Sequence, residues 1–118
     1  MSDANRRKYL RVNYPCQLTM WLDNGGNETI MANTSNISIG GMCVYLNQDI
    51  DLGTKIDVQL NFDTASSFKC QGTVVRSIRE NDSFYNIGIQ FVPLDEIKTA
   101  FLNTKIAKLI VLEQRGKV

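Results

Sequence analysis

Residues 68–91 read Phe-Lys-Cys-Gln-Gly-Thr-Val-Val-Arg-Ser-Ile-Arg-Glu-Asn-Asp-Ser-Phe-Tyr-Asn-Ile-Gly-Ile-Gln-Phe, and this stretch decides the fold. Apolar residues alternate with polar ones on both sides of a polar break at 80–83, with Phe68, Cys70, Val74 and Ile78 before it and Tyr85, Ile87, Ile89 and Phe91 after it. Alternation with a period of two places successive side chains on opposite faces of a strand. The pattern therefore predicts a β-hairpin with one buried face.

The same alternation continues outward from this hairpin toward the amino terminus. Its apolar positions are Tyr14, Cys16, Leu18, Met20 and Leu22, then Met42, Val44 and Leu46, then Ile56, Val58, Leu60 and Phe62. The turn-forming cluster at 23–27 predicts a hairpin, and its second strand is expected to be short and to run through Ile30 and Ala32. The chain therefore contains six predicted strands.

After Pro93 the apolar period changes to that of a helix. Asp95 is a suitable N-cap and Gly116 a suitable stop, which predicts a helix over about 94–113. The apolar positions of this helical period are Ile97, Phe101, Ile106, Leu109 and Ile110. Six short strands without intervening helices are typical of a closed barrel, since closure removes exposed sheet edges. We therefore expect an all-β-dominated fold, a six-stranded antiparallel β-barrel with a C-terminal α-helix across one opening.

Composition limits the class of protein. The chain has 118 residues, of which 43% are hydrophobic and 21% charged, as expected for one globular domain. Thirteen Lys and Arg against twelve Asp and Glu leave a net charge of +1, too balanced for binding a polyanion by bulk charge. The absence of histidine removes Ser/His and Cys/His catalysis and His-ligated metals. We expect no enzyme, no catalytic residue, no metal and no cofactor.

Membrane and export signals are not found in the sequence. No apolar run approaches the length of a membrane span, and residues 1–6 lack the apolar core of a signal peptide. The expected location is the cytoplasm, without membrane insertion. Cys16, Cys43 and Cys70 are odd in number and lie in predicted strands, so we expect buried free thiols.

Charge is distributed unevenly along the chain. Residues 1–11 hold four basic side chains, Arg6, Arg7, Lys8 and Arg11, against Asp3. This segment has no hydrophobic periodicity and is predicted to be a flexible basic arm ahead of a barrel domain at 12–118. Residues 23–63 are acidic, with Lys55 the one basic residue among them, so anion binding in that region depends on the arm.

Two short motifs stand apart from the strand pattern. Arg7 and Arg11 form Arg-x-x-x-Arg, and Asn36, Ser38 and Gly41 form Asn-x-Ser-x-x-Gly. Each alone is weak evidence, because a basic terminus is usually a solvated tail and the second pattern is usually a turn. Together they resemble the PilZ family of cyclic di-GMP receptors, which carries RxxxR on an N-terminal arm and [DN]xSxxG on a barrel. Similarity at 53–54, 72–76 and 86–91 extends the resemblance over roughly residues 6–110.

The resemblance implies a bacterial second-messenger receptor acting on motility, adhesion, exopolysaccharide or virulence, and biofilm regulation belongs with these outputs. The ligand-binding residues that it implies are Arg6, Arg7, Arg11, Asn36, Ser38 and Gly41, with Gly40 and Arg76 as secondary candidates. In similar proteins an arginine directly before RxxxR accompanies an intercalated ligand dimer, so Arg6 implies two cyclic di-GMP molecules per chain. Position 36 holds asparagine where aspartate is commoner in the family, which implies a neutral and weaker bond to the ligand.

The residue types suit this ligand. An arginine side chain bonds phosphate oxygens with two N–H groups, pairs with guanine O6 and N7, and stacks on the base. Asn36 and Ser38 alternate with Ile37 and Ile39, so the two polar side chains project from one face while the isoleucines face the core. Glycine at position 41 permits close approach of a backbone. Trp21 faces outward, where an aromatic side chain more often packs on a neighbour than on a base.

The sequence thus predicts a non-catalytic receptor that relays ligand level to an unknown protein partner by ordering its arm. One alternative is a PilZ-like adaptor that works by protein contact without ligand. The other is a barrel that binds single-stranded nucleic acid through basic grooves and aromatic platforms, which balanced charge and few outward aromatics disfavour.

Overall fold

The computed structural model describes residues 12–13, 15–23, 28–62 and 66–115. The elements in chain order are β1 (Gln17–Asp23), β2 (Glu28–Ile37), β3 (Gly41–Leu46), β4 (Lys55–Asn61), β5 (Ser67–Arg79), β6 (Tyr85–Phe91) and α1 (Glu96–Arg115). The helix begins and ends two residues later than the predicted span of about 94–113. The arm predicted at 1–11 lies outside the described residues.

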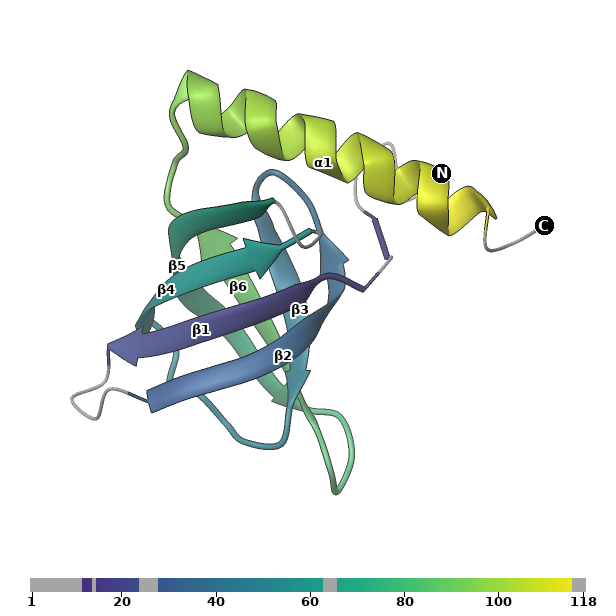
Figure 1. Cartoon of the computed structure of the whole chain (residues 1–118). Helices are drawn as coiled ribbons and strands as arrows, with labels where there is room; N and C mark the ends of the chain where they lie inside the picture. The colour runs from purple at the N-terminus through teal and green to yellow at the C-terminus, as the bar shows by residue number, and fades with distance from the viewer. Residues whose placement is uncertain (1–11, 14, 24–27, 63–65, 116–118) are drawn as a thin grey trace, which may run out of the picture.

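The six strands close into a barrel in the order β1-β2-β3-β6-β5-β4, and every neighbouring pair is antiparallel. Figure 1 shows α1 lying across one end of this barrel. The predicted six-stranded antiparallel barrel with a C-terminal helix is confirmed. Closure comes from the pairing of β1 with β4, which opposes Leu18 to Leu60 and Met20 to Val58.

The barrel interior is filled by the alternating apolar residues of the strands. Leu18, Met20, Val44, Leu60 and Ile87 are each fully buried at 0% exposure. Burial of one such side chain stabilises the fold by about 1.5 to 3 kcal/mol relative to exposure. The predicted free thiols are also confirmed, since Cys16, Cys43 and Cys70 are buried and unpaired with one another.

Helix α1 packs on the barrel through Leu102, Ile106 and Leu109, all of which are buried. Asp95 caps the helix as predicted, because its Oδ1 accepts a hydrogen bond from the Lys98 backbone N–H at 2.7 Å. Ile97, the first apolar position of the helical period, does not face the barrel and is 82% exposed. Ile97 precedes Leu102 by five positions, which turns it about 140° away from the buried stripe.

Two further predictions need correction. The second strand is not short, because β2 extends through polar residues as far as Ile37 and contains Asn36. The motif at 36–41 therefore spans the end of β2, the turn at 38–40 and the first residue of β3. Ile78 does not face the core and is 53% exposed, because the alternation along β5 shifts between Val74 and Arg76.

Candidate functional site

Two β-bulges place a row of side chains on the outer face of the barrel. On β2, Thr34 pairs with Val44 but Asn36 pairs with Cys43, so Ser35 is an extra residue. On β5, Val74 pairs with Ile89 but Arg76 pairs with Gly88, so Val75 is extra. An extra residue reverses the alternation of a strand beyond it. Two positions that would otherwise face the core, 36 and 76, therefore face outward.

The row runs across four neighbouring strands in the order Asn36, Cys43, Gly88 and Arg76. The Arg76 guanidinium lies across Gly88 and donates from Nη2 to Cys43 Sγ at 2.8 Å. A Cβ at position 88 would stand 3.1 Å from Arg76 Cβ and 3.3 Å from its Cζ. Glycine at 88 therefore leaves room for the Arg76 side chain over β6.

A short chain of hydrogen bonds fixes the orientation of Arg76. Its Nη2 also donates to Asn86 Oδ1 at 3.0 Å, and Asn86 Nδ2 donates to Glu80 Oε1 at 3.1 Å. Because Glu80 accepts from the amide nitrogen, the Asn86 amide oxygen is left to face the arginine. No described residue accepts from Arg76 Nε or Nη1, so these N–H groups remain available to a ligand.

The turn between β2 and β3 is closed by Ser38. Its backbone N–H donates to the Gly41 carbonyl at 2.8 Å, and its Oγ accepts from the Gly40 N–H at 3.2 Å. The Ser38 hydroxyl also donates to the same Gly41 carbonyl at 3.4 Å. Ser38 therefore shapes the turn, and its second lone pair is free to meet a ligand.

Gly41 is required by the packing of two strands. A Cβ at this position would stand 2.2 Å from the Ile89 carbonyl oxygen. The backbone that approaches Gly41 closely is thus that of β6. The Gly40 carbonyl accepts from the Phe91 N–H at 2.9 Å, which holds the turn against the end of the same strand.

These residues surround a shallow hollow of about 300 Å³, lined by Asn36, Ser38, Gly40, Gly41, Met42, Cys43, Val75, Arg76, Gly88, Ile89 and Gln90. This volume is at the small end of ligand sites. Arg76 is the charged residue of the lining, so the described part of the hollow favours anionic or electron-rich groups. The structure thus brings together Asn36, Ser38, Gly40, Gly41 and Arg76.

Arg6, Arg7 and Arg11 lie outside the described residues. The chain that follows them is placed, because Val12 and Ile37 form an antiparallel bridge with both N–H···O distances at 3.0 Å. Val12 is fully buried, at 0% exposure. Ile37 stands between Asn36 and Ser38, so the described chain starts at the edge of the hollow.

Sequence reasoning missed Cys43, Gly88, Asn86 and Glu80. The glycine and the asparagine lie in the strand that decides the fold, where they read as ordinary outward positions. Only the register across β3, β6 and β5 shows that they adjoin Arg76.

Burial raises the pKa values of the Cys16 and Cys70 thiols to about 11, so these two remain protonated at neutral pH.

Metal and membrane sites do not appear in the described part of the chain. No group of three His, Cys, Asp or Glu residues in it is arranged to hold a metal ion. Helix α1, the one helix among these residues, is not long and apolar enough to cross a membrane.

Comparisons with known proteins agree with this architecture. A family described as the PilZ domain matches residues 5–108 of the chain. The chain therefore belongs to the PilZ domain family. A comparison with curated protein sequences gives no match.

Solved structures with the same fold include three PilZ proteins. The PilZ domain of Escherichia coli YcgR with c-di-GMP is 18% identical, with a TM-score of 0.75 over 96% of this chain and 99% of that one. The K. pneumonia MrkH–c-di-GMP complex is 16% identical, with a TM-score of 0.72 over 94% of this chain and 54% of that one. The Bacillus subtilis inhibitor of motility MotI is 15% identical, with a TM-score of 0.73 over 92% and 52%. The chain thus spans about half the length of MotI and MrkH.

Proposed function

We propose that this protein is a receptor for cyclic di-GMP that binds the nucleotide between its N-terminal arm and the row Asn36, Cys43, Gly88 and Arg76. The observation that carries the proposal is the Val12–Ile37 bridge, because Val12 directly follows Arg11 in the sequence and Ile37 lies between Asn36 and Ser38. Membership of the PilZ family and the c-di-GMP named for YcgR and MrkH support the choice of ligand.

Chain length supports contact between the arm and this row. Arg11 directly precedes Val12, and Arg7 precedes it by five residues. An extended chain spans at most about 3.3 to 3.6 Å per residue, so the Arg7 backbone stays within roughly 18 Å of Val12. A long arginine side chain from either position can reach a ligand that rests on Asn36 and Arg76.

Each side of the ligand has a matching group. The two arm arginines supply planar forks for the phosphates and for guanine O6 and N7. Arg76 Nε and Nη1 supply a further donor edge from the barrel. Asn36 accepts from a guanine N–H through a neutral amide oxygen, which makes this bond weaker than one to an aspartate. Ser38, Gly40 and Gly41 belong to the turn between β2 and β3, and their small side chains let the ligand approach the backbone closely.

Output is proposed to follow from the arm. Ligand free energy can change the protein only through different affinities for two arm states. Asn13, two residues after the arm, contacts helix α1, because its backbone N–H donates to Glu113 Oε2 at 3.4 Å. We propose that this contact transmits a change in the arm to the helix. We propose a non-catalytic cytoplasmic relay to a protein partner, with motility or biofilm control as its setting.

Calorimetric titration of the purified chain with cyclic di-GMP tests the proposal, with GTP and a short single-stranded oligonucleotide as control ligands. Micromolar or tighter binding is expected for cyclic di-GMP alone. Arg7→Ala or Arg11→Ala should each cost about 2 to 5 kcal/mol, since each leaves a ligand charge or base edge unpaired. Absence of heat with cyclic di-GMP would favour the adaptor, and preference for the oligonucleotide would favour the nucleic-acid barrel.

The same titration counts the ligands. Arg6 adds a third arginine to the arm, which suits the four phosphates and stacked bases of an intercalated ligand dimer. Two cyclic di-GMP molecules per chain are expected, and Arg6→Leu should lower this ratio while leaving some binding. A ratio of one for the parent at saturating concentration would contradict the ligand dimer and leave the choice of ligand intact.

A further inference from the structure

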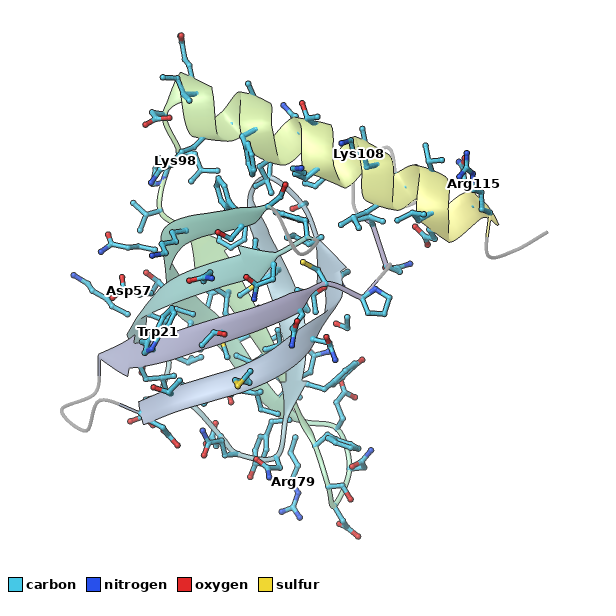
Figure 2. The ribbon with its side chains drawn as sticks, in the orientation of Figure 1. Trp21, Asp57, Arg79, Lys98, Lys108 and Arg115 are labelled. Atoms are coloured by element: carbon cyan, nitrogen blue, oxygen red, sulfur yellow. The ribbon has the colours of Figure 1, made fainter. Side chains whose placement is uncertain are left out.

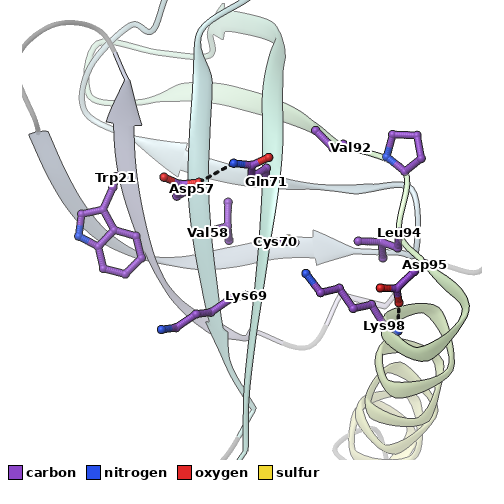
Figure 3. A pocket seen from close by; sticks show the side chains of 11 residues that line it. Trp21, Asp57, Val58, Lys69, Cys70, Gln71, Val92, Leu94, Asp95 and Lys98 are labelled. Atoms are coloured by element: carbon purple, nitrogen blue, oxygen red, sulfur yellow. Dashed lines mark hydrogen bonds between the residues drawn. The ribbon is translucent and has the colours of Figure 1, made fainter.

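A second and larger hollow lies on the outer face of β1, β4 and β5, where the loop before α1 passes over the barrel (Figure 3). Its volume is about 630 Å³, and its lining is Trp21, Asp57, Val58, Lys69, Cys70, Gln71, Val92, Pro93, Leu94, Asp95 and Lys98. This volume is within the range of sites for small organic ligands. We refer to it as the Trp21 groove. Strands β1 and β4 take no part in the row of Asn36 and Arg76.

Trp21 forms one wall of the groove. Its strand position pairs with Asp57, and Asp57 pairs with Gln71, so the three side chains share the outer face. Trp21 is 38% exposed, and Figure 3 shows the Lys69 side chain running toward its indole. A partly exposed indole offers a flat apolar surface on which an aromatic group can stack.

Two lysines supply positive charge. Lys69 comes from β5 and Lys98 from the first turn of α1, and neither forms an ion pair with any described carboxylate. In Figure 3 the Lys69 side chain runs toward Trp21, whereas the Lys98 ammonium lies on the side of β5 that faces α1. Burial raises the pKa of the Cys70 thiol, and the positive charge of Lys98 acts in the opposite direction. Lys98 therefore acts electrostatically on the part of the groove lining where Cys70 lies.

The two acids of the groove are already engaged. Asp57 Oδ1 accepts from Gln71 Nε2 at 3.3 Å. Asp95 Oδ1 accepts from the Lys98 backbone N–H at 2.7 Å, and its charge faces the positive end of the helix dipole. Each carboxylate thus has one hydrogen bond within the fold, whereas the ammonium groups of Lys69 and Lys98 pair with no described carboxylate.

We propose that the Trp21 groove binds a small organic anion with a planar aromatic body. The ring stacks on Trp21, and the apolar loop residues Val92 and Leu94 line the other side of the groove. The anionic group, a carboxylate, sulfonate or phosphate, is attracted by the ammonium groups of Lys69 and Lys98, which line the groove from β5 and α1. This site is separate from the proposed cyclic di-GMP site, so either can fail without the other.

Naphthalene-2-carboxylate is the probe, and 2-naphthalenemethanol is its uncharged counterpart with the same ring. Trp21 is the one tryptophan of the chain, so its indole N–H gives a single proton resonance. Titration of the carboxylate should shift this resonance saturably. Lys69→Gln and Lys98→Gln should each weaken binding roughly three- to fivefold, as expected for an exposed charge pair. The alcohol should bind more weakly than the carboxylate.

Lys108→Gln is the matched control, because Lys108 is an exposed lysine of the same helix and lies farther along it from Trp21 (Figure 2). Arg76→Ala controls for the other site. Both variants should titrate like the parent. The proposal is overturned if the indole resonance does not move at millimolar probe, or if both groove-lysine variants bind the probe as the parent does.

Discussion

Arg76 is oriented by neutral groups. Cys43 Sγ and Asn86 Oδ1 accept hydrogen bonds from Arg76 Nη2. Glu80 bonds to the Asn86 side-chain amide and not to the arginine itself. Among the described residues no carboxylate pairs with this guanidinium, so its charge faces outward toward a ligand. Its position on the barrel is also set before ligand arrives, which reduces the entropy lost on binding.

Replacement of this arginine tests its role directly. Arg76→Ala should weaken cyclic di-GMP binding by about 1.5 to 3 kcal/mol, the usual value of a hydrogen bond to a charged group. Arg79→Ala is the matched control, since Arg79 lies three residues along the same strand and contacts Asp82 at 3.6 Å. Calorimetry should give equal affinities for the parent and the control, and equal affinities for all three proteins would remove Arg76 from the site.

Two glycines of the site should respond differently to the same change. Gly88→Ala places a Cβ against the flexible Arg76 side chain, so affinity should fall by roughly three- to tenfold, about 1 kcal/mol, with little loss of stability. Gly41→Ala places a Cβ 2.2 Å from the Ile89 carbonyl oxygen, so it should lower the free energy of unfolding by about 2 to 3 kcal/mol. Urea denaturation and calorimetry together separate the two effects. Equal stability losses would contradict this assignment.

At the level of elements, the strands could be predicted from alternation, but the bulges could not. The six strands and most of their buried faces follow from apolar alternation with a period of two. The helix follows from a period of 3.6 and from the capping residue Asp95. The extra residues Ser35 and Val75 leave no compositional signal, and a bulge changes which face every later residue takes. This is why Ile78 was expected inside and is outside. It is also why the contact between Arg76 and Cys43 could not be foreseen.

The motif residues were predictable one by one, and their assembly was not. Asn36 and Ser38 could be placed on one face by alternation, yet their meeting with Arg76 depends on pairing between strands distant in sequence. Likewise Ile97 shares a helix face with Phe101, but packing on the barrel buries the face that carries Leu102. Local pattern specifies an element, whereas register and rotation come from packing.

The arm is the element that the proposed relay requires to change. Backbone amides of residues 1–11 are expected to exchange faster without cyclic di-GMP and slower with it, since ligand bonds restrain the segment. The Leu18 and Leu60 amides are internal controls, because they lie opposite each other in the paired strands β1 and β4, which take no part in the proposed site. Hydrogen exchange measured by mass spectrometry checks this. Unchanged exchange in 1–11 at saturating ligand would reject arm ordering as the relay.

For the whole molecule, two buried thiols link stability to pH. The pKa values of Cys16 and Cys70 are raised by burial to about 11 in the folded protein, whereas an unfolded thiol ionises near 8.5. The unfolded chain therefore loses these protons first, and stability falls as pH rises from about 8.5 to 11. Below pH 8.5 both thiols are protonated in the folded and the unfolded chain, so their contribution to the free energy of unfolding is fully present.

The expected loss over this window is roughly 3 kcal/mol for each thiol. Urea denaturation at pH 8 and pH 11 measures it, and a Cys16→Ala/Cys70→Ala double variant is the control for lysine and tyrosine ionisation. The parent should lose more stability than the double variant between the two pH values. Equal losses would show that these thiols ionise alike in the folded and unfolded states.

The most direct measurement of the central claim is a map of backbone amide shifts during titration of the isotope-labelled chain with cyclic di-GMP. The account predicts that the largest shifts fall on residues 36–43 and on Arg76 and Gly88, with the Trp21 indole unchanged. Shifts that avoid this row, or that centre on the Trp21 groove, would contradict it.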